Sequence, residues 1–301
     1  MIGLCCQYLE NKKNKYVNIT NEKTLRYNEY LKNKYSNDKI IDTWKNNIDG
    51  MFNIIKKCNE LNIKVFRISS NLFSLYDSCE NLLENDELKL KLNGVGKYCI
   101  ENNIRLTSHP DQFVVLSSNN KDVIDKSIKM LEHHAWIFDN MGLDKTPYYS
   151  INIHGGKRGN LKVLIDSINT LKENVRNRLT LENDELSYNV KDLYEVYKEV
   201  GVPICFDSHH HTFNTGDYVD EKAFDISLST WKHKPMTHLS NTDPNNINGN
   251  FQDRRKHSDY VHYIPSYQLK YNNENKIDID FEFKMKNIAI FKAVKDFGIV
   301  L

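Results

Sequence analysis

The sequence predicts an α/β fold, namely a single barrel of the TIM type in which parallel β-strands alternate with α-helices. Short apolar segments alternate with longer segments whose apolar residues recur at helical spacing, and repeated helix-to-strand steps imply parallel strands. A polar residue of a metal-binding type follows several of the short segments. In a barrel of parallel strands, side chains at the carboxyl ends converge on one site. The same pattern therefore predicts the fold and the position of a functional site.

The predicted strands are short apolar runs bounded by polar or turn residues. They cover residues 2–6, 64–68, 105–109, 149–154, 179–182, 203–207, 236–239 and 277–282. Helices are predicted between most of them, as at Ile41, Trp44 and Ile48, which recur at helical spacing before the second strand. A length of 301 residues suits one barrel. We therefore expect one domain over residues 1–301.

Residues 241–275 form a polar segment that is rich in Asn. Asp243-Pro244 and Asn248-Gly249 are turn signals within it. The segment is too long for an ordinary connection in a compact domain. It is therefore predicted to be an active-site loop.

The composition excludes several classes of protein. The formal net charge is +1, so any phosphate binding must come from a local patch or a metal rather than from a global basic field. Six cysteines without a Cys-x-x-Cys pair suit a reducing compartment. No signal peptide is evident, and no apolar run approaches the roughly 20 residues that span a bilayer. We expect a soluble intracellular protein, in the cytoplasm or nucleoid, or in the nucleus or a viral factory for a eukaryotic or viral source.

The most informative stretch is Asp207-Ser208-His209-His210-His211, which directly follows the apolar run 202–206. Together with the other strand ends it predicts a set of ligands that share histidine or carboxylate chemistry. The set comprises His109, His154, Glu182, Asp207, His210, His238 and Glu282. Such ligands suit Mn, Zn or Fe, and neighbouring divalent ions suit phosphodiester cleavage.

Other polar residues near these positions are weaker candidates for metal ligands. His209 and His211 should face away from His210 if the backbone stays extended. Asn183-Asp184-Glu185 has the composition of a solvated loop. His133-His134 lies in a helical stretch and is predicted to be structural or exposed.

The motifs, taken in order, resemble those of the UV damage endonuclease family. They are Arg67-Ile68-Ser69-Ser70 with Leu72-Phe73, Ser108-His109-Pro110-Asp111-Gln112-Phe113, Ile153-His154-Gly155-Gly156, Phe206-Asp207-Ser208-His209-His210, His238-Leu239-Ser240 and Asp280-Phe281-Glu282-Phe283-Lys284-Met285-Lys286. Endonuclease IV is a relative with a similar barrel, and both resemble the xylose isomerase type of barrel.

The resemblance implies an ATP-independent, Mn²⁺-dependent enzyme that nicks double-stranded DNA immediately 5′ of cyclobutane pyrimidine dimers and 6-4 photoproducts, leaving a 3′-hydroxyl and a 5′-phosphate. Two or three divalent ions are implied, with Zn²⁺, Co²⁺ or Mg²⁺ as alternatives to Mn²⁺. The metal positions carried over are His109, His154, Glu182, Asp207, His210, His238, His257 and Glu282. Catalytic roles are assigned to Glu182, Glu282 and His238. No nucleotide cofactor, no membrane and a monomer are expected.

The Gln112-Phe113 pair follows Pro110-Asp111 in a predicted loop at the mouth. Polar and aromatic side chains there can enter a duplex and contact bases. In the family a Gln-Tyr pair probes the lesion, and Phe113 keeps the ring without the hydroxyl. The alternative is that Phe113 packs beneath the loop.

Two basic clusters are candidates for contact with DNA phosphates. Lys157-Arg158 follows the His154-Gly155-Gly156 turn, and Arg254-Arg255-Lys256 precedes His257. Cations beside a predicted site suit backbone phosphates. The alternative for each cluster is an ordinary solvated surface.

The chain departs from the family pattern at Met236, where many members have a lysine that can be carboxylated to bridge metals. Lys234 lies one pleat lower, about 7 Å away along the strand. The segment Cys6-Gln7-Tyr8 also matches the amino-terminal DNA-contact motif poorly. Three alternative functions stay open: an apurinic-site endonuclease of the endonuclease IV type, a sugar isomerase, and a non-catalytic damage-binding barrel.

Overall fold

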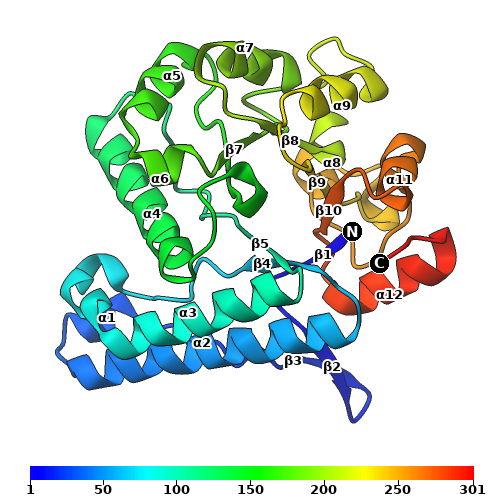
Figure 1. Cartoon of the computed structure of the whole chain (residues 1–301). Coiled ribbons are helices and arrows are strands. Elements are labelled where there is room, and N and C mark those ends of the chain that lie inside the picture. Colours follow the sequence, from blue (N-terminus) through cyan, green and yellow to red (C-terminus); the bar gives the residue numbers. More distant parts are fainter.

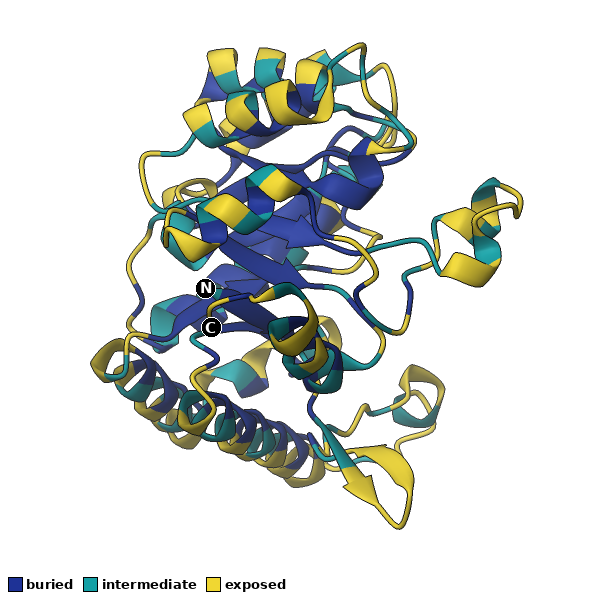
Figure 2. Cartoon of the chain, turned by 90° about the vertical axis from the view of Figure 1, so that its right-hand side faces the viewer, coloured by how far each residue is buried: buried dark blue, intermediate teal, exposed yellow.

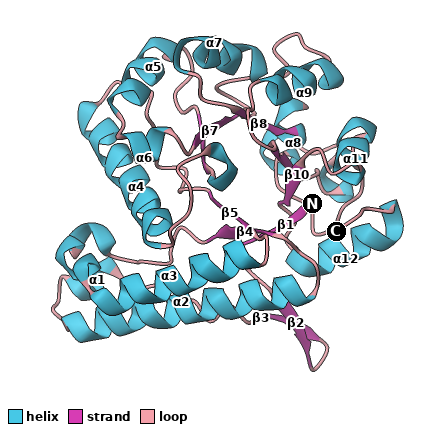
Figure 3. Cartoon of the chain, in the orientation of Figure 1, coloured by secondary structure: helices cyan, strands magenta, loops and turns pink.

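The computed structural model describes residues 1–301 and contains a closed barrel of parallel strands in the order β1-β10-β9-β8-β7-β6-β5-β4. The barrel strands are β1 (Ile2–Cys5), β4 (Val65–Ile68), β5 (Arg105–Ser108), β6 (Ile151–His154), β7 (Leu179–Glu182), β8 (Ile204–Asp207), β9 (Met236–Leu239) and β10 (Asp278–Phe281). They lie inside a ring of helices (Figures 1 and 3). Each predicted strand exists with its ends within two residues of the predicted bounds. The predicted TIM-type fold is confirmed.

Helices on the outside of the barrel cover it with their apolar faces. The longer ones are α2 (Asn37–Glu60), α3 (Asp86–Glu101), α4 (Lys121–Asn140), α5 (Leu161–Thr170), α7 (Val190–Val200), α9 (Asp220–Ser229), α11 (Ser266–Asn273) and α12 (Lys286–Phe297). Short turns are α1 (Tyr27–Tyr30), α6 (Glu173–Arg176), α8 (Ser208–His211) and α10 (Phe251–Arg254), with 3₁₀ turns η1 (Tyr76–Ser78), η2 (Glu80–Glu84), η3 (Pro147–Tyr149) and η4 (Pro244–Asn246). In α2 the buried face includes Trp44, Ile48 and Met51, at the spacing that the sequence shows. Figure 2 shows buried inner and exposed outer helix faces. No helix is both long and apolar enough to cross a membrane.

A two-stranded hairpin, β2 (Leu9–Lys12) and β3 (Lys15–Asn18), projects outside the barrel beside α2 (Figure 1). Its turn residues Lys13 and Asn14 both have positive φ, 51° and 62°, which suits a two-residue hairpin turn. The hairpin is anchored by an ion pair between Glu10 and Lys57. It was not predicted, because β3 is exposed throughout and its sequence lacks an apolar alternation.

The amino-terminal end of the barrel, called the floor here, is closed by buried charges and a small apolar layer. The Asp278 carboxylate lies 2.9 Å from Arg105 Nη1 and 2.7 Å from Lys234 Nζ. Met236 packs with Val65 and Cys205 inside the barrel. Because Lys234 is ion-paired at the floor, it does not replace the family lysine.

The predicted loop over 241–275 is shorter than expected, because α11 begins at Ser266. The rest of the segment contains only η4 and α10 as regular turns. It is tied to the barrel mouth by a bridge between Thr242 and His257 and by a hydrogen bond of 2.9 Å from the amide of Ser258 to the Asn241 carbonyl. These contacts hold His257 beside the strand ends.

Candidate metal centre

The register of the barrel strands places the predicted ligands side by side at their carboxyl ends, called the mouth here. His154 on β6 lies opposite Glu182 on β7, and Asp207 on β8 lies opposite His238 on β9. Neighbouring residues in a parallel register project to the same side of the sheet. Four ligands from four consecutive strands therefore face one site.

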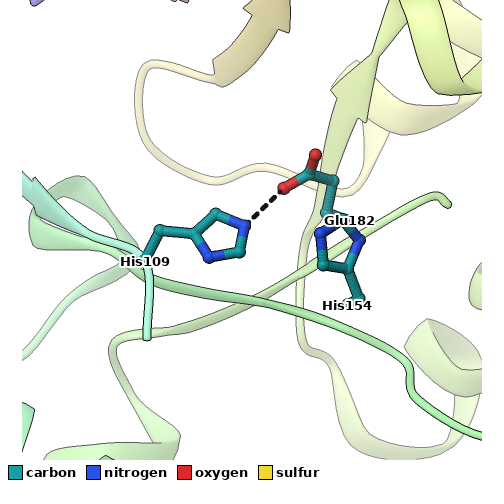
Figure 4. Close-up of side chains that lie close together, drawn as sticks. All are labelled: His109, His154 and Glu182. Carbon is teal, nitrogen blue, oxygen red and sulfur yellow. Dashed lines mark hydrogen bonds and ion pairs between the residues drawn. The ribbon is translucent and has the colours of Figure 1, made fainter. Parts of the chain in front are cut away.

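Glu182 is the centre of this site and is only 1% exposed. Its Oε2 lies 3.1 Å from His109 Nε2 and 3.1 Å from His238 Nδ1, and its Oε1 lies 3.3 Å from His210 Nδ1. Figure 4 shows His109, His154 and Glu182 converging. Burial opposes ionisation, but the imidazoles, chiefly those of His238 and His154, hold the pKa of Glu182 well below its ordinary value.

Two groups of donors have the compactness of ion-binding sets. The first comprises His109, His154 and Glu182, and the second comprises Glu182, Asp207 and His238; in each, one donor atom per residue lies within 4.8 Å of the others. Two ligands about 2.1 Å from one ion and at a right angle to each other are about 3 Å apart. Glu182 belongs to both groups, so its carboxylate lies within reach of both sets of donors.

Several donor atoms at the mouth have no hydrogen-bond partner inside the protein. His154 Nδ1 and Asp207 Oδ2 are buried and unpaired. His238 Nδ1 lies close to Glu182 yet makes no hydrogen bond. Buried polar atoms are normally satisfied, so this set of nitrogen and oxygen donors fits a divalent transition metal.

Glu282 and His257 extend the site beyond β10. Glu282 Oε1 lies 3.3 Å from His238 Nδ1, and its Oε2 lies 3.7 Å from His257 Nδ1. His257 is half-buried and comes from the long loop after β9. The structure thus brings all eight carried-over positions to one mouth, including the one that strand patterns did not indicate.

Arg67 on β4 is a site residue that the ligand pattern missed. Its guanidinium lies 2.5 Å from Glu282 Oε1 and 3.1 Å from Asp280 Oδ2. Asn152 on β6 similarly donates a hydrogen bond to Glu182. Such partners orient ligands, and the one available signal was a charged or amide residue inside an otherwise apolar strand.

The histidine run is helical rather than extended. Asp207 caps α8, with its side chain accepting from the amide of His210 at 2.7 Å. The predicted alternation of His209 and His211 with His210 was therefore wrong, because it assumed an extended backbone. His209 packs against Phe213, with ring centroids 5.1 Å apart, and its ring centroid lies 5.9 Å from that of His257. His211 is fully buried, with its Nε2 3.6 Å from Asp220 Oδ1.

The segment Asn183-Asp184-Glu185 is buried, so its prediction as a solvated loop was wrong. Asn183 exchanges two hydrogen bonds of 2.9 Å with the backbone of Asp207. Asp184 Oδ1 accepts from the amide of Leu186 at 2.8 Å. These polar side chains satisfy backbone groups at the strand ends, a use that composition alone does not reveal.

A groove of about 1040 Å³ runs over the ligands and is lined by Gln112, Phe113, Lys157 and Arg255 among others. Phe113 is 71% exposed and Gln112 is also exposed. The alternative in which Phe113 packs under its loop was therefore wrong. An exposed aromatic ring at the wall of a groove is available for stacking.

The four predicted phosphate contacts differ in their surroundings. Lys157, Arg158 and Arg254 are exposed, and the Arg254 guanidinium lies 5.6 Å from the ring centroid of Phe213. Arg255 is ion-paired with Glu185. One of the four cations therefore already has an anionic partner.

Comparison with known proteins agrees with the site. Residues 1–299 match the family described as UV-endonuclease UvdE. The chain is 33% identical to the UV DNA damage endonuclease of Nostoc sp. over 288 residues, covering 90% of this chain and 86% of that protein. It is 31% identical to the UV DNA damage endonuclease of Deinococcus radiodurans over 274 residues, covering 86% and 85%.

Solved structures show the same fold. The crystal structure of SacUVDE superposes with a TM-score of 0.81 at 25% identity and covers 99% of both chains. A D-psicose 3-epimerase from Clostridium cellulolyticum superposes with a TM-score of 0.52 at 13% identity, covering 77% and 79%, which reflects the shared barrel. The family predicted from the motifs is confirmed: this chain belongs to the UV-endonuclease UvdE family.

Proposed function

We propose that this protein nicks double-stranded DNA immediately 5′ of cyclobutane pyrimidine dimers and 6-4 photoproducts by metal-dependent hydrolysis, leaving a 3′-hydroxyl and a 5′-phosphate. The observation that carries the proposal is the carboxylate of Glu182, which both compact donor groups share beneath a groove walled by the exposed Gln112 and Phe113. The names of the relatives support an endonuclease acting on UV-damaged DNA.

The cofactor we propose is Mn²⁺, in two or three ions held by the eight ligand positions. When bound, such ions activate water and stabilise the charge that develops on the phosphate and the departing oxygen. Glu182 would act as the ligand shared by both donor groups. Glu282 would act as a ligand beside His238 and His257. Arg67 and Asn152 fix the orientation of these two carboxylates, so the ligands are arranged before DNA arrives.

Gln112 and Phe113 are the proposed lesion probe. Poorly stacked, damaged bases cost less free energy to extrude than intact ones, and an inserted ring fills the space they leave. The double variant Gln112→Ala/Phe113→Ala should lose preference for damaged over intact DNA while its Mn²⁺ binding is unchanged. Equal discrimination by the variant and the wild type would reject this role.

The proposed function is tested with end-labelled duplexes carrying one cyclobutane dimer, one abasic site or no lesion. Each is incubated with Mn²⁺ and the protein, with and without a chelator. We expect a chelator-sensitive nick directly 5′ of the dimer, and no nick with Glu182→Gln. Cleavage restricted to the abasic site would instead indicate an apurinic-site endonuclease, and binding without any cleavage would indicate a damage-binding barrel.

A further inference from the structure

Glu185 lies at the edge of the metal centre although no ligand pattern includes it. Its side chain is 8% exposed, and its Oε2 lies 3.7 Å from His210 Nε2. The other imidazole nitrogen of His210, Nδ1, lies 3.0 Å from the carbonyl oxygen of Asn183. The same Nδ1 lies 3.3 Å from Glu182 Oε1, so the two imidazole nitrogens of His210 face two different carboxylates. Glu185 lies beside Nε2, the nitrogen that does not face Glu182.

The second oxygen of Glu185 is engaged by a different element. Oε1 is ion-paired with the guanidinium of Arg255, which belongs to the long loop between β9 and α11. Arg255 is 35% exposed and, like Glu185, lines the groove. The pair thus joins the loop after β7 to the loop that carries His257, and it lies where DNA phosphates would pass.

We propose that Glu185 and Arg255 form an exchangeable latch, in which a DNA phosphate takes the place of Glu185 on Arg255 and so releases the Glu185 carboxylate toward His210 Nε2. The inference rests on the proposed function, because it needs a phosphate in the groove. Arg255 contributes to phosphate binding only after its internal partner is displaced. Glu185 acts as a positioning residue whose carboxylate becomes available when substrate is present.

The latch predicts that removing the acidic partner of this partly exposed ion pair strengthens DNA binding instead of weakening it. Removing one partner of a purely structural ion pair leaves the other charge unpaired and destabilises the protein. Removing Glu185 from a latch instead frees Arg255 for DNA. Glu185→Gln should therefore bind a dimer-containing duplex more tightly than the wild type in the presence of a chelator, by roughly two- to fivefold, which is the scale of a partly exposed ion pair.

A double-mutant cycle separates this effect from the loss of one negative charge in the groove. Arg255→Gln should weaken DNA binding and lower the magnitude of the salt slope by about one. In the Arg255→Gln background, Glu185→Gln should no longer tighten binding. Lys256→Gln serves as the matched control, because Lys256 is on the same loop and pairs with Asp253 at 2.8 Å. Combined with Lys256→Gln, the tightening by Glu185→Gln should persist.

A second arm uses Mn²⁺ alone and no DNA. Isothermal titration should show that Arg255→Gln binds Mn²⁺ more tightly than the wild type, because the Glu185 carboxylate is already released. The gain should disappear in Arg255→Gln/Glu185→Gln. Weaker DNA binding by Glu185→Gln, or Mn²⁺ affinity that is unchanged in Arg255→Gln, would overturn the latch. A wild-type protein that binds no DNA would refute the proposed function itself, while the Mn²⁺ arm would still decide whether Arg255 restrains Glu185.

Discussion

The two ends of the barrel both bury charges, but they balance them differently. At the floor, the Asp278 carboxylate is matched by the cations of Arg105 and Lys234 at 2.9 and 2.7 Å. At the mouth, Glu182 is surrounded by imidazoles, and Asp207 keeps an unpaired buried oxygen. A closed set of opposite charges indicates a structural role. Carboxylates that gather with histidines and keep unpaired donors indicate a site for an added cation.

The largest expected effect lies at the floor. Arg105→Met removes one of the cations around the buried Asp278 and leaves the carbonyls of Tyr148, Lys234 and Pro147 without their guanidinium donor. The expected loss is about 3–5 kcal/mol of unfolding free energy. Urea unfolding in a chelator, with and without added Mn²⁺, measures it. Because the floor is independent of the metal, Mn²⁺ should stabilise the variant and the wild type by the same increment. A larger increment in the variant would show that the two ends are coupled.

A second test concerns a buried histidine outside the metal centre. Burial lowers the pKa of His134 on α4 to about 4, below the ordinary value of about 6.5. The unfolded chain therefore binds more protons than the folded one below pH 6.5, so stability falls as the pH drops from 6.5 toward 4. The loss from this residue should reach up to about 3 kcal/mol. His134→Gln should flatten the pH dependence of urea unfolding over that range, and an unchanged dependence would contradict the assignment.

A smaller effect is expected from removing Asn152, which orients Glu182 at the mouth. Asn152 donates a hydrogen bond to Glu182 and accepts one from Thr180 Oγ1 at 2.7 Å. Asn152→Ala should lower Mn²⁺ affinity by about 10- to 100-fold, the usual effect of losing a residue that orients a ligand. Isothermal titration with Mn²⁺ checks this. Thr180→Val is the control, because Thr180 contacts Asn152. An equal loss of Mn²⁺ affinity in both variants would indicate general disruption of the barrel.

The smallest effect is expected from Arg254, an exposed residue of the long loop after β9. Arg254 is exposed and has no carboxylate partner among the ion pairs of the structure. Arg254→Gln should reduce the slope of log affinity against log salt by about one and leave thermal stability within about 0.5 kcal/mol of the wild type. Fluorescence anisotropy with a labelled duplex over a salt series measures the slope. An identical slope would remove Arg254 from the phosphate contacts.

The positions of the ligands were predictable because they depend on local rules. An apolar strand followed by histidine or carboxylate predicts a residue at a barrel mouth, and the register then brings His154 beside Glu182 and Asp207 beside His238. His257 lies in a loop without such a pattern, so only the family resemblance indicated it. The roles of these residues stay predictions until the variants are measured.

What the sequence did not predict depends on partners distant along the chain. Arg67 and Glu282 are 215 positions apart, and Glu185 and Arg255 are 70 apart, yet each pair is in contact. The charge run at residues 183–185 has the composition of a solvated loop, and only the fold shows that it satisfies backbone groups. Similarly, the turn of α8 arises because Asp207 caps it, which strand alternation cannot anticipate.

The position of Glu182 in both donor groups also has a thermodynamic consequence. If each donor group holds one ion, the two ions would share the Glu182 carboxylate and would not bind independently, because the first ion would change the charge that the second one meets. Filling of the site should therefore follow a linked, stepwise isotherm rather than the sum of two separate ones. A residue that belongs to one donor group only, such as His154 or Asp207, is therefore the position at which one group can be weakened alone, whereas loss of Glu182 impairs both groups at once.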